Sequence, residues 1–451
     1  MRRILPWLGM LAALGCSSND SKTSGWLLVG TGHETDVWSD VDRIELVVRT
    51  QDNDESVFAT VDPPVDGEYV RFDLSGAPQG VLEVRGLDEE DHVVATGETA
   101  AVDPSRLYGR SIYALAGRTG SFNRPPGQLW EDGQGEYPPV ALFGSSYVAM
   151  AGCPHTGDAA ARLDAYDFLL WGPASVSLIP CPRLGCHVAS LATLDNGLVV
   201  LIGSDWATYA DFACGSDCTG ELEQPASFDW EDLAGGQSVR RSGEATFVVG
   251  ATRPEGPTTA VLELGAPGWI AEFTLETPRA GAAATWVEDR GLVVLGGADG
   301  DAPGAELLED NEETFTALPL PPDTTQGAAI VAFDNRRLLR VGGKLAGGDW
   351  APSVVYDLAC TSDCEPKIFG SPLELMRASA FRLVESVLVV GTAADGFTKA
   401  VLLTADGPQT IELREPRRGA SATTSPAGRV VLVGGVLETD EPALTLELYF
   451  P

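Results

Sequence analysis

The stretch PRAGAAATWVEDRGLVVLGG, residues 278–297, combines a turn with Arg and Gly, two short apolar runs separated by a charged turn, and a terminal pair of glycines. Apolar runs of this length on either side of a polar turn are typical of a β-hairpin. Because glycine has no Cβ, the terminal pair allows a sharp turn with positive φ after an inner strand and a close approach of neighbouring backbone. A phosphate-binding loop is a poorer interpretation, since no Lys-Ser or Lys-Thr follows and no helical pattern begins there.

Apolar runs that end at or near a glycine recur along the chain. The seven runs are YVAMAG (147–152), LVVLIGS (198–204), TFVVG (246–250), LVVLGG (292–297), LLRVGG (338–343), VLVVG (387–391) and VVLVGG (430–435). Their terminal glycines lie about 44 to 51 residues apart, a period typical of β-propeller blades. A unit of this size cannot bury a core alone, so we expect seven sheets packed around an axis.

The repeated unit resembles the kelch repeat. Gly281 precedes Gly296 by 15 residues, and the same spacing separates Gly327 from Gly342 and Gly419 from Gly434. Further matches are the Tyr-Asp pairs and the aromatic residues that follow the glycine-terminated strand, namely Tyr166-Asp167, Tyr356-Asp357, Trp269 and Phe315. Three of the seven units keep a true Gly-Gly. The resemblance implies a kelch-like β-propeller over residues 138–451, which we expect to have seven blades.

The last unit, residues 417–451, has room for about three strands, fewer than a complete blade needs. A propeller that is not closed leaves an open sheet edge. We therefore expect residues 119–137, a linker that contains GQLWED (127–132), to supply the missing outer strand.

Residues 25–118 lack the propeller period and contain short alternating strands instead. Ile44, Leu46 and Val48 share one face of a strand, and residues 81–87 and 92–97 flank an acidic turn in the manner of a hairpin. About 90 residues of this kind suggest a β-sandwich, Ig-like or transthyretin-like, and the whole chain is therefore expected to be all-β. We expect this domain to act as a spacer.

The first sixteen residues have the pattern of an export signal. Arg2 and Arg3 precede an apolar run, residues 4–14, that is too short to span a bilayer. The following Ala13-Leu14-Gly15-Cys16 resembles the lipobox of bacterial lipoproteins. This resemblance implies lipidation of Cys16, a tether over residues 17–24, and anchoring to the outer membrane of a Gram-negative bacterium, facing the periplasm or the cell surface. The alternative is an ordinary secretory signal cleaved nearby.

The chain is strongly acidic, with 65 acidic and 30 basic residues and a formal charge of −35. Such a charge repels nucleic acid and anionic lipid, so we expect no nucleic-acid partner, and we expect a monomer. We expect no cofactor, but three acidic runs offer oxygen ligands that would suit calcium: residues 52–55, 299–301 and 309–313. The alternative is that these runs are solvated loops.

Three close cysteine pairs remain after Cys16 is set aside, and in an exported protein they are candidates for local disulfides. The pairs are Cys181/Cys186, Cys214/Cys218 and Cys360/Cys364. The segments DFACGSDCTG (211–220) and DLACTSDCEP (357–366) are near copies, so we expect the same closed loop in two blades. Zinc is a poorer interpretation, since one pair supplies two of four ligands and no histidine lies nearby. Cys153 is left over.

Four arginines lie at matching turns and are candidates for a binding face on the propeller: Arg279, Arg377, Arg417 and Arg418. The alternative is that they donate hydrogen bonds to loops within their own repeat.

No catalytic motif is present, and the propeller region contains two histidines, His155 and His187. We therefore expect a non-catalytic binding or scaffolding module for a protein or glycan. One alternative is an enzyme of the oxidase or lyase type that acts on carbohydrate in the central channel, and another is calcium-assisted surface adhesion. Three or more His, Tyr or acidic groups converging on the channel would favour the enzyme.

Overall fold

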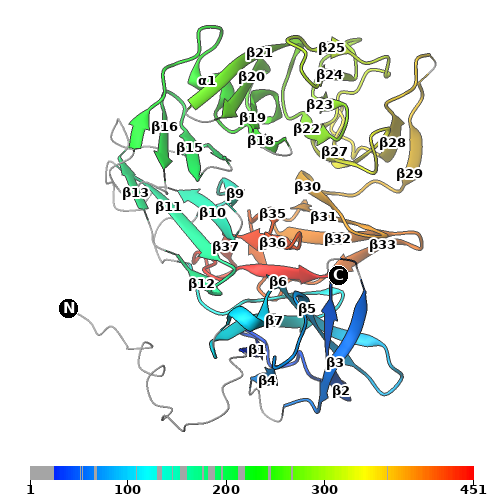
Figure 1. Cartoon of the computed structure of the whole chain (residues 1–451). Helices are drawn as coiled ribbons and strands as arrows, with labels where there is room; N and C mark the ends of the chain where they lie inside the picture. Colours follow the sequence, from blue (N-terminus) through cyan, green and yellow to red (C-terminus); the bar gives the residue numbers. More distant parts are fainter. Residues whose placement is uncertain are drawn as a thin grey trace.

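The computed structural model describes residues 25–451 except 51, 53, 65–68, 108, 130–134, 145, 153–159, 175–176, 181–187, 195–196, 212–218, 242–244, 266–267 and 363. The predicted lipidation site Cys16 and the tether lie outside this range. Within it, the one α-helix is the four-residue α1 (Trp230–Leu233), and strands form an N-terminal domain and a propeller, as predicted for an all-β chain (Figure 1).

The N-terminal domain is one seven-stranded sheet in the order β3-β2-β5-β6-β7-β1-β4. Its strands are β1 (Trp26–Gly30), β2 (Arg43–Arg49), β3 (Glu55–Val61), β4 (Val70–Asp73), β5 (Gly80–Leu87), β6 (Val93–Val102) and β7 (Ser111–Arg118). Residues 111–115 of β7 pair with β1, whereas residues 116–118 pair with β6, so β7 passes from one half of the sheet to the other. The nearly closed sheet encloses a single core that includes Ile44, Leu46 and Val48, in agreement with the predicted sandwich.

The remaining sheets form a seven-bladed β-propeller (Figure 1), which confirms the predicted fold. Blade 1 contains β9 (Val140–Phe143), β10 (Tyr147–Gly152), β11 (Ala160–Asp167), β12 (Gly172–Pro173) and β13 (Ser177–Pro180). Blade 2 contains β14 (Ser190–Thr193), β15 (Leu198–Ile202), β16 (Ala207–Asp211) and β17 (Thr219–Glu221). Blade 3 contains β18 (Gln237–Arg240), β19 (Thr246–Val249), β20 (Thr258–Gly265) and β21 (Gly268–Arg279). Blade 4 contains β22 (Ala283–Val287), β23 (Gly291–Leu295), β24 (Ala305–Glu309) and β25 (Thr316–Ala317). Blade 5 contains β26 (Gln326–Ala332), β27 (Arg337–Lys344), β28 (Ser353–Asp357) and β29 (Lys367–Gly370). Blade 6 contains β30 (Met376–Arg382), β31 (Val387–Thr392), β32 (Thr398–Thr404) and β33 (Gly407–Ile411).

Blade 7 is assembled from both ends of the propeller sequence. Its inner strands are β35 (Ser421–Thr424), β36 (Val430–Val433) and β38 (Glu447–Phe450), and its outer strand is β8 (Ser121–Asn123). Phe122 of β8 is fully buried, with its ring centroid 5.4 Å from that of Tyr449. The strand thus lies before GQLWED, within which Leu129 donates a backbone hydrogen bond to Leu444. A two-stranded ribbon, β34 (Arg417–Arg418) with β37 (Val436–Leu437), accompanies this blade.

The glycine-terminated runs form the second strand of each blade, one strand out from the strand nearest the axis. In blade 4, Gly296 and Gly297 end β23 with φ values of 81° and 68°. A Cβ on Gly297 would lie 2.5 Å from the carbonyl oxygen of Ala280, in the turn that precedes β22. The pair therefore lets the end of the second strand cross over the turn that leads into the innermost strand.

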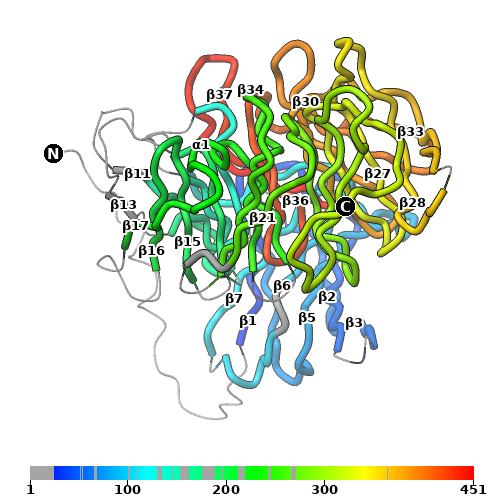
Figure 2. Tube along the Cα trace, turned by 90° about the horizontal axis from the view of Figure 1, so that it is seen from above, coloured from blue at the N-terminus to red at the C-terminus, as the bar shows by residue number. Residues whose placement is uncertain are grey.

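The N-terminal domain packs against the propeller beside blades 7 and 1 (Figures 1 and 2). Leu115 of β7 joins a hydrophobic cluster with Val148 of blade 1 and Phe450 of blade 7. At the same junction Arg124 contacts Glu34 at 2.7 Å and Glu415 at 2.8 Å. Apolar burial and ion pairs thus hold the two domains together.

Candidate ligand-binding site in the central channel

The centre of the propeller is a cavity of about 570 Å³, lined by residues of the innermost strands of all seven blades. We call this cavity the central channel. Its volume lies within the range of small-molecule sites, which is roughly 300–1,000 Å³. The lining is mainly small apolar and hydroxyl side chains, and the hydroxyl-bearing members include Ser190, Ser238, Thr285, Ser379, Ser421 and Thr423.

The lining of the channel contains one charged side chain among the residues that the structure describes, namely Arg377. One tyrosine, Tyr137, also lines it, and no aspartate, glutamate or histidine does so within the described part of the chain. His155 and His187 lie outside the described residues. In a chain with 65 acidic residues, a lining of this kind gives the channel a local positive charge.

In six of the seven blades, the turn before the innermost strand contains a residue with left-handed backbone next to the start of that strand. In four blades this residue is a glycine: Gly235, Gly281, Gly327 and Gly419, with φ between 62° and 84°. A Cβ on Gly327 would lie 2.7 Å from Met376 Cε in the next blade, and the Gly327 amide donates to the Gly281 carbonyl at 2.8 Å. The turns thus contact one another around one opening of the channel, which we call the turn mouth.

Two further blades have a bulky residue at the position of this glycine. Arg377 has φ of 48° and lies two residues before Ser379, which pairs with Val390 as Ala329 pairs with Val341 in blade 5. Tyr137 has φ of 56°, and its amide donates to the Gly419 carbonyl at 2.5 Å. Positive φ is unfavourable for a residue with a Cβ, so both residues adopt a backbone conformation that glycine would adopt more easily.

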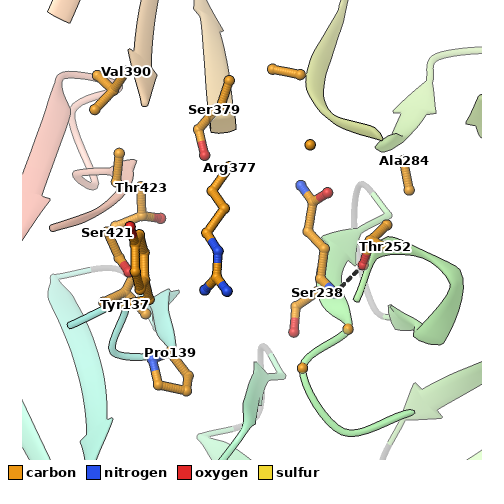
Figure 3. A pocket seen from close by; sticks show the side chains of 18 of the residues that line it. Tyr137, Pro139, Ser238, Thr252, Ala284, Arg377, Ser379, Val390, Ser421 and Thr423 are labelled. Atoms are coloured by element: carbon orange, nitrogen blue, oxygen red, sulfur yellow. Dashed lines mark hydrogen bonds between the residues drawn. The ribbon is translucent and has the colours of Figure 1, made fainter. Parts of the chain in front are cut away.

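The two side chains meet at the turn mouth. Arg377 Cζ lies 4.2 Å from the centre of the Tyr137 ring, a cation–π contact, and the Tyr137 hydroxyl lies 3.0 Å from Thr392 Oγ1. Thr392 follows Gly391 at the position of the second glycine of a pair. Figure 3 shows the Arg377 side chain extending into the channel, with Ser379, Ser421 and Thr423 on the same side. Within the described residues, Arg377 has no hydrogen bond and no carboxylate partner.

The other three candidate arginines lie elsewhere. Arg279, the last residue of β21, is fully buried and reaches into blade 4, where it pairs with Glu306 at 3.0 Å and donates to the Gly296 carbonyl. Arg417 is fully buried in blade 7 and pairs with Glu447 at 2.7 Å. These two donate hydrogen bonds within their own repeat, which is the alternative that we had kept open. Arg418 is partly exposed and pairs with Asp440.

Sequence reasoning missed Tyr137, because the turn before blade 1 has neither the Arg nor the Gly of the other turns. A signal was present nonetheless. Tyr137 precedes Gly152 by 15 residues, the spacing that separates Gly281 from Gly296. Applying this spacing to every unit would have placed Tyr137 in the ring of turns.

The predicted cysteine pairs lie away from the channel lining or outside the described residues. Cys360 and Cys364 form a disulfide between β28 and β29, with their Cα atoms 5.6 Å apart, which confirms one of the three predicted pairs. The two other predicted disulfides are not among the bonds that the structure describes, and they stay predictions. The four cysteines of these two pairs, Cys181, Cys186, Cys214 and Cys218, lie outside the described residues, and so does Cys153.

The predicted calcium sites lie on acidic runs away from the channel. Runs 299–301 and 309–313 are exposed turns of blade 4. Run 52–55 belongs to the N-terminal domain and includes residue 53, which lies outside the described residues. Within the described residues, no three or more His, Cys, Asp or Glu side chains are grouped so that they could hold a metal ion.

Known proteins were compared with the chain. No protein-family model and no curated protein sequence matches it. Similar solved structures include a streptogramin B lyase (13% identity, 72% of this chain, 98% of that chain, TM-score 0.44), an oligogalacturonate lyase in complex with manganese (11%, 74%, 98%, 0.44) and the WD40 domain of coronin from Toxoplasma gondii (12%, 74%, 87%, 0.41). Similarity at this level carries no argument about ligand or activity. Among the described residues, no helix is long and apolar enough to cross a membrane.

Proposed function

We propose that this chain is a lipid-anchored protein of the bacterial cell envelope whose kelch-like propeller binds a glycan or protein partner without catalysis. The observation that carries the binding role is the central channel, to which all seven blades contribute and in which Arg377 has no hydrogen-bond or carboxylate partner among the described residues. A cavity with a few polar groups that converge on it is the usual form of a small-ligand site. The turn mouth is the opening through which we expect the partner to enter.

The anchor rests on the sequence alone, through the apolar run and Cys16. In this arrangement the N-terminal sandwich separates the propeller from the membrane. Labelling with a radioactive fatty acid in a Gram-negative host tests the anchor. We expect the native protein to be labelled and the Cys16→Ser variant to remain unlabelled, and an unlabelled native protein would exclude lipidation.

A glycan array and a pull-down from envelope extract test the binding role of the channel. Thr423→Trp places a large side chain in the channel from an innermost strand, and we expect it to abolish binding of any hit. Val384→Trp is the matched control, because Val384 is 97% exposed in the β30–β31 hairpin, at the end of β30 away from Arg377. Hits that bind both variants equally well would show that the channel is not the binding site.

A further inference from the structure

We propose that the turn mouth recognises the carboxylate of a hydroxylated organic acid, of the sugar-acid class, through the guanidinium of Arg377. This inference rests on the proposed binding role of the channel and names the chemical class of its ligand.

The first argument is that the two departures from the left-handed glycine occur at one place, beside one of the four units that lack the second glycine of the pair. Arg377 and Tyr137 replace the left-handed glycine of the turn, and Thr392 replaces the second glycine of the pair. These residues come from blades 1 and 6, yet the Arg377 side chain contacts Tyr137, which in turn contacts Thr392. Residues held in unfavourable backbone conformations are concentrated at functional sites, because folding alone would favour their replacement.

The second argument is that the exposed Arg377 side chain contacts an aromatic ring while its N–H donors stay available. Arg279, Arg340 and Arg417 each pair with a carboxylate inside a blade. Arg377 instead contacts the Tyr137 ring, and its N–H groups have no hydrogen-bond acceptor among the described residues. A guanidinium presents two parallel N–H donors that match a carboxylate, so an arginine that pairs with no carboxylate of the protein is suited to bind one.

The third argument concerns what surrounds the cation. Ser379, Ser421 and Thr423 lie beside Arg377 and are neutral hydrogen-bonding groups that suit ligand hydroxyls (Figure 3). The volume of about 570 Å³ exceeds what an inorganic anion fills. The formal charge of −35 repels polyanions, so a small ligand with one carboxylate is favoured over a highly charged polymer.

Calorimetric titration of the full chain with D-glucuronate and with D-glucose tests the inference, because the two sugars share their ring hydroxyls and differ at the carboxylate. We expect glucuronate to bind at least tenfold more tightly than glucose. Arg377→Gly, which restores the glycine of the other turns, should weaken glucuronate binding at least tenfold. Arg377→Lys keeps the charge without the paired donors and should give an intermediate affinity. Arg336→Gly, at an exposed hairpin, is the control and should bind as the native protein does.

The outcomes separate this inference from the binding role of the channel. Equal binding of both sugars, unchanged by Arg377→Gly, would overturn the carboxylate inference, and so would an absence of binding by either sugar. In both cases the channel would remain the binding site if Thr423→Trp still abolished binding of a sugar or an array hit. Glucuronate binding that survives Thr423→Trp but is lost in Arg377→Gly would support the carboxylate contact and place the ligand outside the channel.

Discussion

Arg279 and Arg417 occupy equivalent positions before the innermost strands of blades 4 and 7, and each pairs with a fully buried glutamate of the third strand. Burial raises the pKa of Glu447, and the positive charge of Arg417 acts in the opposite direction. Each arginine also donates to backbone carbonyls near the glycine pair. These ion pairs therefore connect the turn before the innermost strand to the body of the blade.

Glu306→Ala should destabilise the protein strongly, because it leaves the Arg279 charge buried without a partner. We expect the free energy of unfolding to fall by about 3–5 kcal/mol in urea denaturation. Replacing both partners by apolar residues, as in Arg279→Met with Glu306→Leu, should recover most of this loss. A loss below about 1 kcal/mol for the single variant would contradict the structural role of the pair.

The matching turns predicted the four arginines as a group, but their different roles depend on an offset of one or two residues. Arg279 and Arg417 lie two residues before the left-handed position, so their side chains enter the blade. Arg377 occupies the left-handed position itself, and its side chain lines the channel. A turn motif in the sequence does not specify which residue adopts positive φ, because that depends on the bulge at the start of β30.

At the scale of the element, strand β8 completes blade 7. It pairs with β38 along residues 121–123, and Phe122 joins a cluster that includes Leu388 of blade 6 and Leu432 of blade 7. Because β8 comes from the N-terminal side of the propeller sequence, its pairing joins the first and last parts of the ring. Without it, the outer edge of β38 would be unpaired.

Phe122→Ala should lower the free energy of unfolding by about 3–5 kcal/mol, the usual cost of removing a fully buried ring. Chemical denaturation followed by tryptophan fluorescence measures this change. Val384→Ala removes an apolar side chain that is 97% exposed and should leave stability nearly unchanged. Equal stability of the two variants would mean that β8 does not contribute to closing the propeller.

The glycine-terminated runs predicted seven blades, and each run forms the second strand of its blade. The second strands β15 and β23 are buried at every position, since the neighbouring blades cover both of their faces. The innermost strand β35 is only partly buried, because one of its faces lines the channel. Continuous hydrophobicity marks the most buried strand of a blade, and this is not the strand nearest the axis.

At the scale of the whole molecule, the junction between the domains depends on charged groups. Arg124 lies between Glu34 of the N-terminal domain and Glu415 of the segment before blade 7. Burial alone would raise the pKa of Glu415, but hydrogen bonds from Thr445 and Arg124 and the charges of Arg417 and Arg124 lower it below its ordinary value. The folded protein therefore favours the ionised form of this carboxyl.

Acidification should weaken the stabilisation that the ionised Glu415 carboxyl gives to the folded protein. A carboxyl with a lower pKa in the folded state stabilises the protein fully above its ordinary pKa of 4.5, and this stability is lost as the pH falls through the folded value. Urea denaturation between pH 7 and about pH 3 should therefore show a steeper acid loss for the native protein than for Glu415→Gln. Glu313→Gln, at an exposed turn, should follow the native curve. Parallel curves for the native protein and Glu415→Gln would contradict the assignment.

Taken as a whole, the propeller is a closed ring in which a position that glycine fills in four blades is occupied in two others by Arg377 and Tyr137, which line the central channel. Thermal unfolding of the native protein and Arg377→Gly, each with and without saturating D-glucuronate, tests this claim most directly. The Arg377→Gly substitution relieves the left-handed strain, which stabilises the folded protein by about 1–2 kcal/mol. This gain offsets the cost of about 0.5–1 kcal/mol that comes from the greater freedom of glycine in the unfolded chain. We predict that the unliganded variant melts at or above the native temperature and that glucuronate raises the melting temperature of the native protein alone. A variant that melts well below the native protein, or that glucuronate stabilises equally, would contradict the account.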